Sequence, residues 1–546
     1  MDRNKVAGLL DDVNQGRISR RDFFKVAVGL GVSMPAAAAL LQGCAPPAGP
    51  EPTAAPAAPT KTTLVVGQPK AAINMNPLAM GSWDDMPLLT SVMDSLFDPD
   101  YAKGELIPVL VEEWEQTDAV TWNIKLKEGV QFHKGYGEMT AEDYAFWLNT
   151  VVTEQPAAYF TMGSGKVKEA VVTDKYGLEI RLNEPWAAFW VMTLITYGGV
   201  VFSKKAYEEM GGEAFGLNPI GTGPFELESW TPGGDVVLKR FEDYHDPNLP
   251  HLEEIRFTGV EDPVVRLEKM RAGELDYTVG LDSKDVPDME EDPNLNVVWG
   301  PGHNWDVIRF NHNESDEPWG DVRVRKAIAY AIDRQQIVDV IYYGGATPED
   351  DPLPAGYIGA DPDHKFFPDT ADVDKAKDLL AEAGYADGFK MPAMTDERAN
   401  QRAEAQLLAD QLSKVGIEME IEVVDRATSS SRLQNTEFHT NVGTAGMASA
   451  DSDSAISIWY HKDSSSSNGY DNPRVNELSD QAAASMDKEE RAKLYREAVD
   501  IIIGEDCANA IICNVARMYV LAKGLAGFIP YPLHLFPYFK NMYWEE

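Results

Sequence analysis

The chain has 546 residues, of which 44% are hydrophobic and 10% aromatic, so it has the length for several domains and an ordinary globular composition. Its formal net charge of -40 argues against nucleic acid as a partner, because binding to a phosphate backbone requires a basic surface. The acidity is more typical of a solvated, soluble surface than of a site for cationic ligands.

The first 44 residues have the order of an export signal. Arg20 and Arg21 precede an apolar run over 26–41, and Cys44 follows that run. The run is too short and too rich in small residues to span a bilayer comfortably. We interpret 1–44 as a twin-arginine signal that also resembles a bacterial lipoprotein signal, with Cys44 as the lipidated first residue of the mature protein. The expected location is the periplasm or the outer face of the cell membrane, with the lipid as the only membrane anchor.

A linker follows the predicted anchor. Residues 45–62 are dominated by Pro and Ala. Proline fixes φ and removes backbone donors, so this segment is expected to be an extended spacer and no part of a core. Such a spacer would hold a globular body away from a membrane surface.

Beyond the linker, the pattern of apolar residues predicts strands and helices that mix without a regular βαβ rhythm. The predicted strands span 63–67, 121–126, 178–182, 236–240, 307–311 and 417–424. The predicted amphipathic helices span 141–151, 321–341, 373–383, 398–415 and 488–503. Thr140 followed by Asp143 is typical of a capping box at the start of the first of these helices. Trp114 and Trp122 are expected in the core.

Only three cysteines occur in the chain. If Cys44 carries lipid, Cys507 and Cys513 remain, and they flank a predicted turn from a helix to a strand. A disulfide between them is geometrically possible in an oxidising compartment, whereas two buried free thiols are the simpler interpretation. Neither interpretation makes this a disulfide scaffold.

Enzyme signatures are missing from the sequence. The segment 164–166 ends like a phosphate-binding loop, but Phe160 stands where the first glycine belongs and Val167 replaces the Ser or Thr. There is no G-x-S-x-G or H-E-x-x-H motif, and the nine histidines lack the spacing of zinc ligands. We therefore expect no catalytic residue, no cofactor and no metal.

Five segments, in the same order along the chain, resemble the extracytoplasmic solute-binding proteins of family 5, the peptide- and nickel-binding components of ABC importers. They are 111–143, 221–244, 266–276, 310–334 and 468–478, and the similarity extends from about Leu64 to the C-terminus. Within the second segment, Gly221 and Gly223 with Pro224 predict a tight turn that needs unusual φ angles.

The resemblance implies an α/β fold of the periplasmic-binding-protein-like type II, in the large three-domain class. Two lobes would be joined by a hinge, and an extra domain would be inserted in the first lobe. The mapping assigns lobe I to 61–96, 204–303 and 508–546, the extra domain to 97–203, and lobe II to 304–507. Crossovers near 304–311 and 505–515 would form the hinge, which lets the lobes close on a ligand.

The resemblance also implies residues for the ligand site. The segment after the Asn76-Pro77 turn brings Ser82 and Trp83 to the cleft, and the hinge-side strand brings Asn304 and Trp305. The family's lobe II loop carries a Trp and then an Asp that binds a peptide ammonium. In this chain Met447 replaces that Trp, and the register can slip, so Asp451 and Asp453 are alternative candidates. A carboxylate facing a closed cleft would require a positively charged ligand.

The function implied is that of an ABC importer's substrate-binding protein, which captures a peptide or related organic solute and delivers it to permease and ATPase subunits. The protein would act as a monomer and would bind no nucleic acid. Alternatives within the family are an oligosaccharide or a nickel complex as ligand, or a role as sensor or scaffold. A secreted hydrolase is the least favoured alternative.

Overall fold

The computed structural model describes residues 61–79, 85–100, 105–154, 165–194, 199–447, 451–530 and 538–545. The predicted export signal with Cys44, most of the linker, and Ser82 and Trp83 lie outside the described residues. Among the residues that are described, no helix has the length and apolar character needed to cross a membrane.

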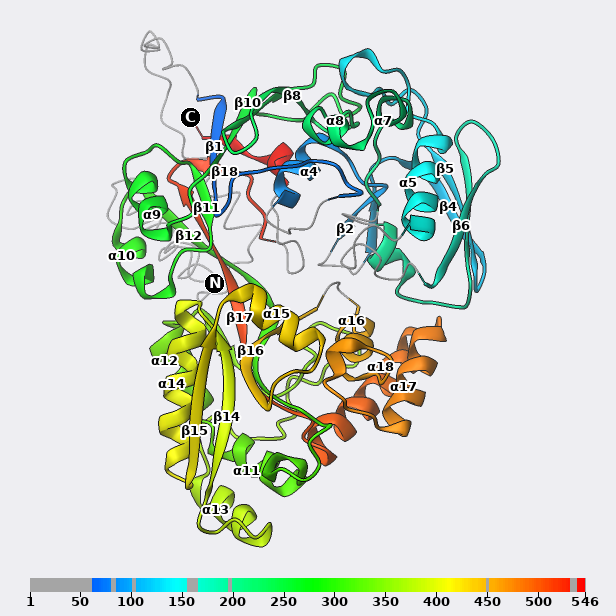
Figure 1. Cartoon of the computed structure of the whole chain (residues 1–546). Helices are drawn as coiled ribbons and strands as arrows, with labels where there is room; N and C mark the ends of the chain where they lie inside the picture. The colour runs from blue at the N-terminus through cyan, green and yellow to red at the C-terminus, as the bar shows by residue number, and fades with distance from the viewer. Residues whose placement is uncertain are drawn as a thin grey trace, which may run out of the picture. The chain divides into compact units, whose positions relative to one another are not determined.

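The largest sheet has the strand order β15-β14-β16-β12-β17-β11-β1-β10-β9-β8, and β13 also pairs with β17 (Figure 1). In chain order its strands are β1 (Thr63–Gln68), β8 (Phe225–Trp230), β9 (Val236–Arg240), β10 (Glu254–Gly259), β11 (Tyr277–Val279), β12 (Leu295–Phe310), β13 (Ala346–Pro348), β14 (Phe389–Asp396), β15 (Ile417–Val424), β16 (Thr440–Gly446) and β17 (Asn509–Ala522). Parallel pairs such as β1 with β10 and β14 with β15 lie beside antiparallel ones, so the sheet is mixed.

Two long strands connect the halves of this sheet. β12 and β17 pair antiparallel from Leu295 opposite Ala522 to Arg309 opposite Asn509. One end of this pair borders β16, and the other end borders β11. The predicted hinge segments near 304–311 and 505–515 lie on these two strands.

The buried apolar residues form two main clusters. One draws mainly on residues between 64 and 257 and on 519–542, and the other draws on residues between 305 and 513. A smaller cluster lies around Met289 and Val520. This grouping agrees with the predicted division into lobes, whose boundaries stay a prediction.

A separate sheet has the order β4-β5-β7-β6, and β2 pairs with β3. Their bounds are β2 (Phe97–Asp100), β3 (Glu105–Pro108), β4 (Val111–Asp118), β5 (Thr121–Leu126), β6 (Val167–Val172) and β7 (Gly177–Leu182). Trp122 on β5 is buried, as predicted. The prediction for Trp114 was wrong, because its side chain is 40% exposed on the edge strand β4. The Trp114 ring packs edge-on against the ring of Phe97, with 5.2 Å between the centroids.

The helices are α4 (Met86–Val92), α5 (Ala141–Glu154), α7 (Lys204–Met210), α8 (Gly212–Leu217), α9 (Pro263–Arg271), α10 (Val286–Glu291), α11 (Val322–Ala331), α12 (Arg334–Ile341), α13 (Val373–Glu382), α14 (Ala399–Ser413), α15 (Arg426–Gln434), α16 (Asp453–Tyr460), α17 (Pro473–Ala484) and α18 (Lys488–Val499). Short 3₁₀ or π turns and the small β18–β19 pair (Leu525–Ala526 and Tyr543–Trp544) complete the described elements.

The structure confirms the Asp143 half of the predicted capping box and divides one predicted helix. The Asp143 carboxylate accepts hydrogen bonds from the Thr140 backbone N–H and hydroxyl at 2.9 and 3.0 Å. The predicted helix 321–341 is two helices, because the side chain of Asp333 accepts a bond from the Gln336 N–H and caps a new start.

The structure requires glycine at Gly221 and Gly223 for a different reason from the unusual φ angles that the sequence analysis predicted. Neither has a positive φ. An added Cβ would lie 2.2 Å from the Val92 carbonyl oxygen at Gly221 and 2.5 Å from the Val92 carbonyl carbon at Gly223. Close approach to the end of α4 therefore excludes a side chain at these positions. The simpler interpretation of the cysteines is confirmed, because Cys507 and Cys513 are both free and buried.

Candidate ligand site

Three predicted ligand residues meet where β12 passes the end of β16. Asn304 lies opposite Gly446, and an added Cβ at that glycine would be 2.1 Å from the Asn304 side-chain oxygen. The backbone N–H of Met447 donates to the His303 carbonyl at 3.1 Å, which places Met447 beside the same strand. The structure thus brings Asn304, its neighbour Trp305 and Met447 together from segments about 140 residues apart.

These three side chains have different exposures. Asn304 is half-buried, whereas Trp305 is 1% exposed and Met447 is 5% exposed. The Trp305 ring meets Trp459 edge-on at 6.3 Å between centroids, inside the second apolar cluster. Of these three side chains, only that of Asn304 is partly exposed, whereas Trp305 and Met447 are packed inside the protein.

Asp451 has a cationic partner within the chain. Its carboxylate is 2% exposed and accepts two charge-assisted bonds from the Arg491 guanidinium at 2.6 and 2.8 Å. Arg491 also lies over the Tyr495 ring, 5.4 Å from its centroid. The positive charge that the sequence analysis expected from a ligand is supplied here by α18.

Asp453 is also engaged by protein groups. Its carboxylate is 6% exposed and accepts bonds from the Trp186 indole N–H at 3.0 Å and the Ser457 hydroxyl at 2.5 Å. Burial, followed by the negative charge of Asp451, raises the pKa of the Asp453 carboxyl. A ligand ammonium at Asp453 would have to compete with the Trp186 indole. The ligand roles of both aspartates stay predictions.

The contact through Trp186 joins distant segments. Trp186 follows β7, in the predicted extra domain, and lies 267 residues from Asp453. The next residue, Ala187, donates its backbone N–H to the Ala483 carbonyl at the end of α17 at 2.8 Å. Sequence reasoning missed Trp186 and Arg491, because no local pattern marks partners so far apart along the chain.

One group of potential metal ligands occurs among the described residues. Donor atoms of Asp306, Glu404 and Cys513 lie within 4.8 Å of one another, and all three side chains are buried. Burial, followed by the charge of Asp306, raises the pKa of both the Glu404 carboxyl and the Cys513 thiol. The raised pKa keeps the Cys513 thiol protonated at neutral pH, which does not fit a metal site, since a thiol must lose its proton to bind a metal.

Asp306 is instead the acceptor of a hydrogen-bond network. Its carboxylate accepts bonds from the Thr444 hydroxyl at 2.8 Å and the Gln401 amide at 3.2 Å, and Tyr342 donates its hydroxyl to the other oxygen. These donors come from β16, α14 and the end of α12, so the network connects β12 to the elements around it.

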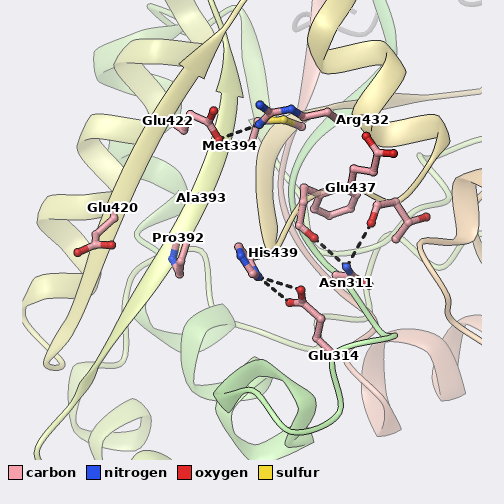
Figure 2. A pocket seen from close by; sticks show the side chains of 12 residues that line it. Asn311, Glu314, Pro392, Ala393, Met394, Glu420, Glu422, Arg432, Glu437 and His439 are labelled. Atoms are coloured by element: carbon pink, nitrogen blue, oxygen red, sulfur yellow. Dashed lines mark hydrogen bonds and ion pairs between the residues drawn. The ribbon is translucent and has the colours of Figure 1, made fainter.

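A cavity of about 330 Å³ lies between β14, β15, β16 and α15 (Figure 2). Two pairs of charged groups line it: Arg432 bonds Glu422 at 2.8 Å, and His439 lies 2.8 Å from Glu314. Of the predicted ligand residues that the structure describes, none lines this cavity. It is therefore separate from the candidate site on β12.

Comparison with known proteins agrees with this fold. The glutathione-binding protein GsiB of Shigella boydii serotype 4 is 27% identical over 436 residues, which cover 77% of this chain and 83% of GsiB. The protein of the same name from Escherichia coli K12 is 26% identical over the same coverage.

Solved structures show the same architecture. DppA from Helicobacter pylori, in complex with the peptide STSA, has a TM-score of 0.76 at 23% identity and covers 89% of this chain and 99% of its own. HbpA2 from Haemophilus parasuis has a TM-score of 0.77 at 23% identity, with 89% and 100% coverage. NikA from Staphylococcus aureus, in complex with Ni(L-His)2, has a TM-score of 0.71 at 21% identity, with 88% and 100% coverage. The α/β fold is therefore of the periplasmic-binding-protein-like type II, as the sequence predicted.

The family profile described as bacterial extracellular solute-binding proteins, family 5 Middle, matches residues 105–467. Because this match covers more than half of the chain and the fold agrees, the protein belongs to family 5 of the bacterial extracellular solute-binding proteins.

Proposed function

We propose that this protein is the extracytoplasmic substrate-binding component of an ABC importer, which captures a peptide or related organic solute and delivers it to a membrane permease. The observation that carries the proposal is family membership over residues 105–467. Relatives named for glutathione and solved structures named for peptide complexes favour a peptide, since glutathione is itself a tripeptide.

The arrangement of β12 and β17 supports capture by a hinge. These strands run between the two apolar clusters and provide the continuous backbone that a hinge motion would bend. The bond from Trp186 to Asp453 and the backbone bond from Ala187 to Ala483 would then form when the lobes close.

The proposed ligand site keeps the residues that the family resemblance implied. Ser82, Trp83 and Asn304 would contact the solute directly, and Trp305 and Met447 would support the β12 side of the site. Asp451 or Asp453 would act on a ligand ammonium only if its protein partner were displaced, which makes this part of the site the most demanding to test.

The cellular setting is proposed from the first 44 residues. The protein would be exported by the twin-arginine route, lipidated at Cys44, and held at the membrane by the lipid alone. It would work as a non-catalytic monomer with permease and ATPase subunits as partners.

The test is identification of the solute together with a measurement of closure. Protein purified from its native source would be analysed by native mass spectrometry, and small-angle scattering would follow with and without the solute found. We expect one peptide-sized solute per chain and a smaller radius of gyration when it is bound. Turnover of that solute by pure protein, abolished by a point mutation, would instead identify an enzyme. A bound nickel complex or sugar would keep the transport role and reject the peptide.

A further inference from the structure

The side chain of Arg517 on β17 is a cation whose hydrogen-bond donors have no acceptor among the described residues. It is half-buried, and within the described part of the chain its guanidinium forms no hydrogen bond and no ion pair. Its Nε atom is fully buried and has no acceptor among the described residues. The guanidinium group lies near the Tyr519 ring, whose centroid is 5.9 Å from Cζ. A buried donor without an acceptor destabilises a protein, so an acceptor from outside the chain would be favourable here.

A second unfilled donor lies beside Arg517. Tyr277 on β11 is 2% exposed, and its hydroxyl has no hydrogen-bond partner in the described part of the chain. Its ring is 6.4 Å from the Tyr519 ring, which Arg517 also contacts. Burial raises the pKa of the Tyr277 hydroxyl, which therefore keeps its proton and can donate it. The Arg517 guanidinium and the Tyr277 hydroxyl thus both lie near Tyr519, and neither has an acceptor among the described residues.

Arg517 lies at a gap in the strand pairing along β17. Arg517 lies opposite Gly300 on β12, where an added Cβ would be 2.9 Å from the Tyr519 ring. On the other edge of β17, β13 pairs at Val515 and β11 pairs from Tyr519, so position 517 falls between two neighbouring strands. Val515 is itself opposite Asn304, the half-buried residue of the proposed ligand site.

We propose that Arg517, with the Tyr277 hydroxyl, forms an anion subsite that binds a carboxylate of the transported solute. The inference rests on the proposed function, because it assigns a binding role to a group beside the proposed ligand strand. The chain carries a net charge of -40, so an anionic solute is repelled at long range and requires a local cation for binding. Guanidinium is suited to this, since two parallel N–H groups match a carboxylate. Removal of this contact should weaken binding about tenfold to a hundredfold.

The experiment uses the full mature chain and defined peptides. A mixture of di- and tripeptides is offered as free acids or as C-terminal amides, and the best-bound member is measured by calorimetry. We expect the free acid to bind about ten to a hundred times more tightly than its amide. Arg517→Gln should abolish this preference, Arg517→Lys should retain part of it, and Tyr277→Phe should lower affinity about two- to tenfold. Arg474→Gln, at an exposed arginine paired with Glu497, is the matched control and should change nothing.

The outcomes separate this inference from the proposed function. If peptides bind and a folded Arg517→Gln variant keeps the full preference for acids, the subsite is wrong while the transport role stands. If no peptide binds, the peptide proposal fails, and the subsite is tested with acetate alone. Stabilisation of the parent by millimolar acetate over an equal concentration of chloride, lost in Arg517→Gln and kept in Arg517→Lys, supports the subsite. No such stabilisation of the parent overturns it.

Discussion

Substitution of Glu404 by Gln should stabilise the protein at neutral pH. Glu404 on α14 is fully buried, and neither carboxylate oxygen has a hydrogen-bond donor among the described residues. The titratable and charged groups that act on it are Asp306 from β12, Tyr342 after α12, Cys513 from β17 and Arg398 before α14. Burial, followed by the charge of Asp306, raises the pKa of Glu404 well above its ordinary value. Burial therefore favours the neutral form of the Glu404 carboxyl group in the folded protein.

The magnitude follows from proton linkage. The unfolded chain releases the Glu404 proton near pH 4.5, whereas the folded chain releases it at a higher pH. Above pH 4.5 the folded state binds more protons than the unfolded state, so its stability falls by about 1.4 kcal/mol for each pH unit. Glutamine has the shape of the neutral acid without this cost, so the expected gain is about 1.4 kcal/mol for each pH unit that separates the two pKa values, less the cost of its extra N–H.

The assay is urea unfolding of the parent and of Glu404→Gln at pH 4.5, 5.5, 6.5 and 7.5. The two free energies of unfolding should agree at pH 4.5 and diverge steadily above it. Glu382→Gln, on an exposed position of α13, is the control and should follow the parent throughout. A variant that is less stable than the parent at pH 7, or a difference that does not change with pH, would refute the reasoning. Such a result would mean that Glu404 is ionised and balanced by a bound cation.

Three further predictions concern other parts of the chain. Arg491→Gln leaves the buried Asp451 carboxylate without its cation, so the free energy of unfolding in urea should fall by about 3–5 kcal/mol. Adding Asp451→Asn to this variant should recover much of the loss, and a double variant without recovery would argue against the ion pair. Burial lowers the pKa of His133 and His312 to about 4, below the ordinary 6.5. The unfolded chain therefore binds more protons, and the free energy of unfolding should fall as pH drops from 6.5 towards 4. Glu404→Gln lacks the opposing effect of Glu404, so its fall should be steeper, and equal slopes in the two proteins would contradict the assignment. Cys44→Ala should move the protein from the membrane fraction to the soluble fraction, and continued membrane binding would reject the lipid anchor.

Local patterns were sufficient for several individual elements. The alternation in 121–126 predicts β5, because one face of a strand in contact with a core needs an apolar residue at every second position. Thr140 and Asp143 predict the start of α5, since both capping bonds form within four residues. The five ordered segments likewise predicted the family and the fold class, which the comparisons confirm.

The same local reasoning was insufficient where a neighbour in space decides the outcome. Trp114 was expected in the core, but β4 is an edge strand, and a strand's place in a sheet depends on which other strands pair with it. The predicted helix 321–341 is interrupted because Asp333 caps a second helix, a choice that local propensity leaves open.

The charges near the proposed ligand site show the clearest division between sequence and structure. The sequence by itself determined that an acidic loop with Asp451 and Asp453 follows Met447. Only the tertiary structure decided that Arg491, 40 residues from Asp451, and Trp186, 267 residues from Asp453, bond these carboxylates. The same holds for Arg517, which has no acceptor among the residues that the structure describes. The physical reason is that the electrostatic environment of a buried group is set by atoms within a few ångströms, and chain folding brings those atoms from positions that no local pattern specifies.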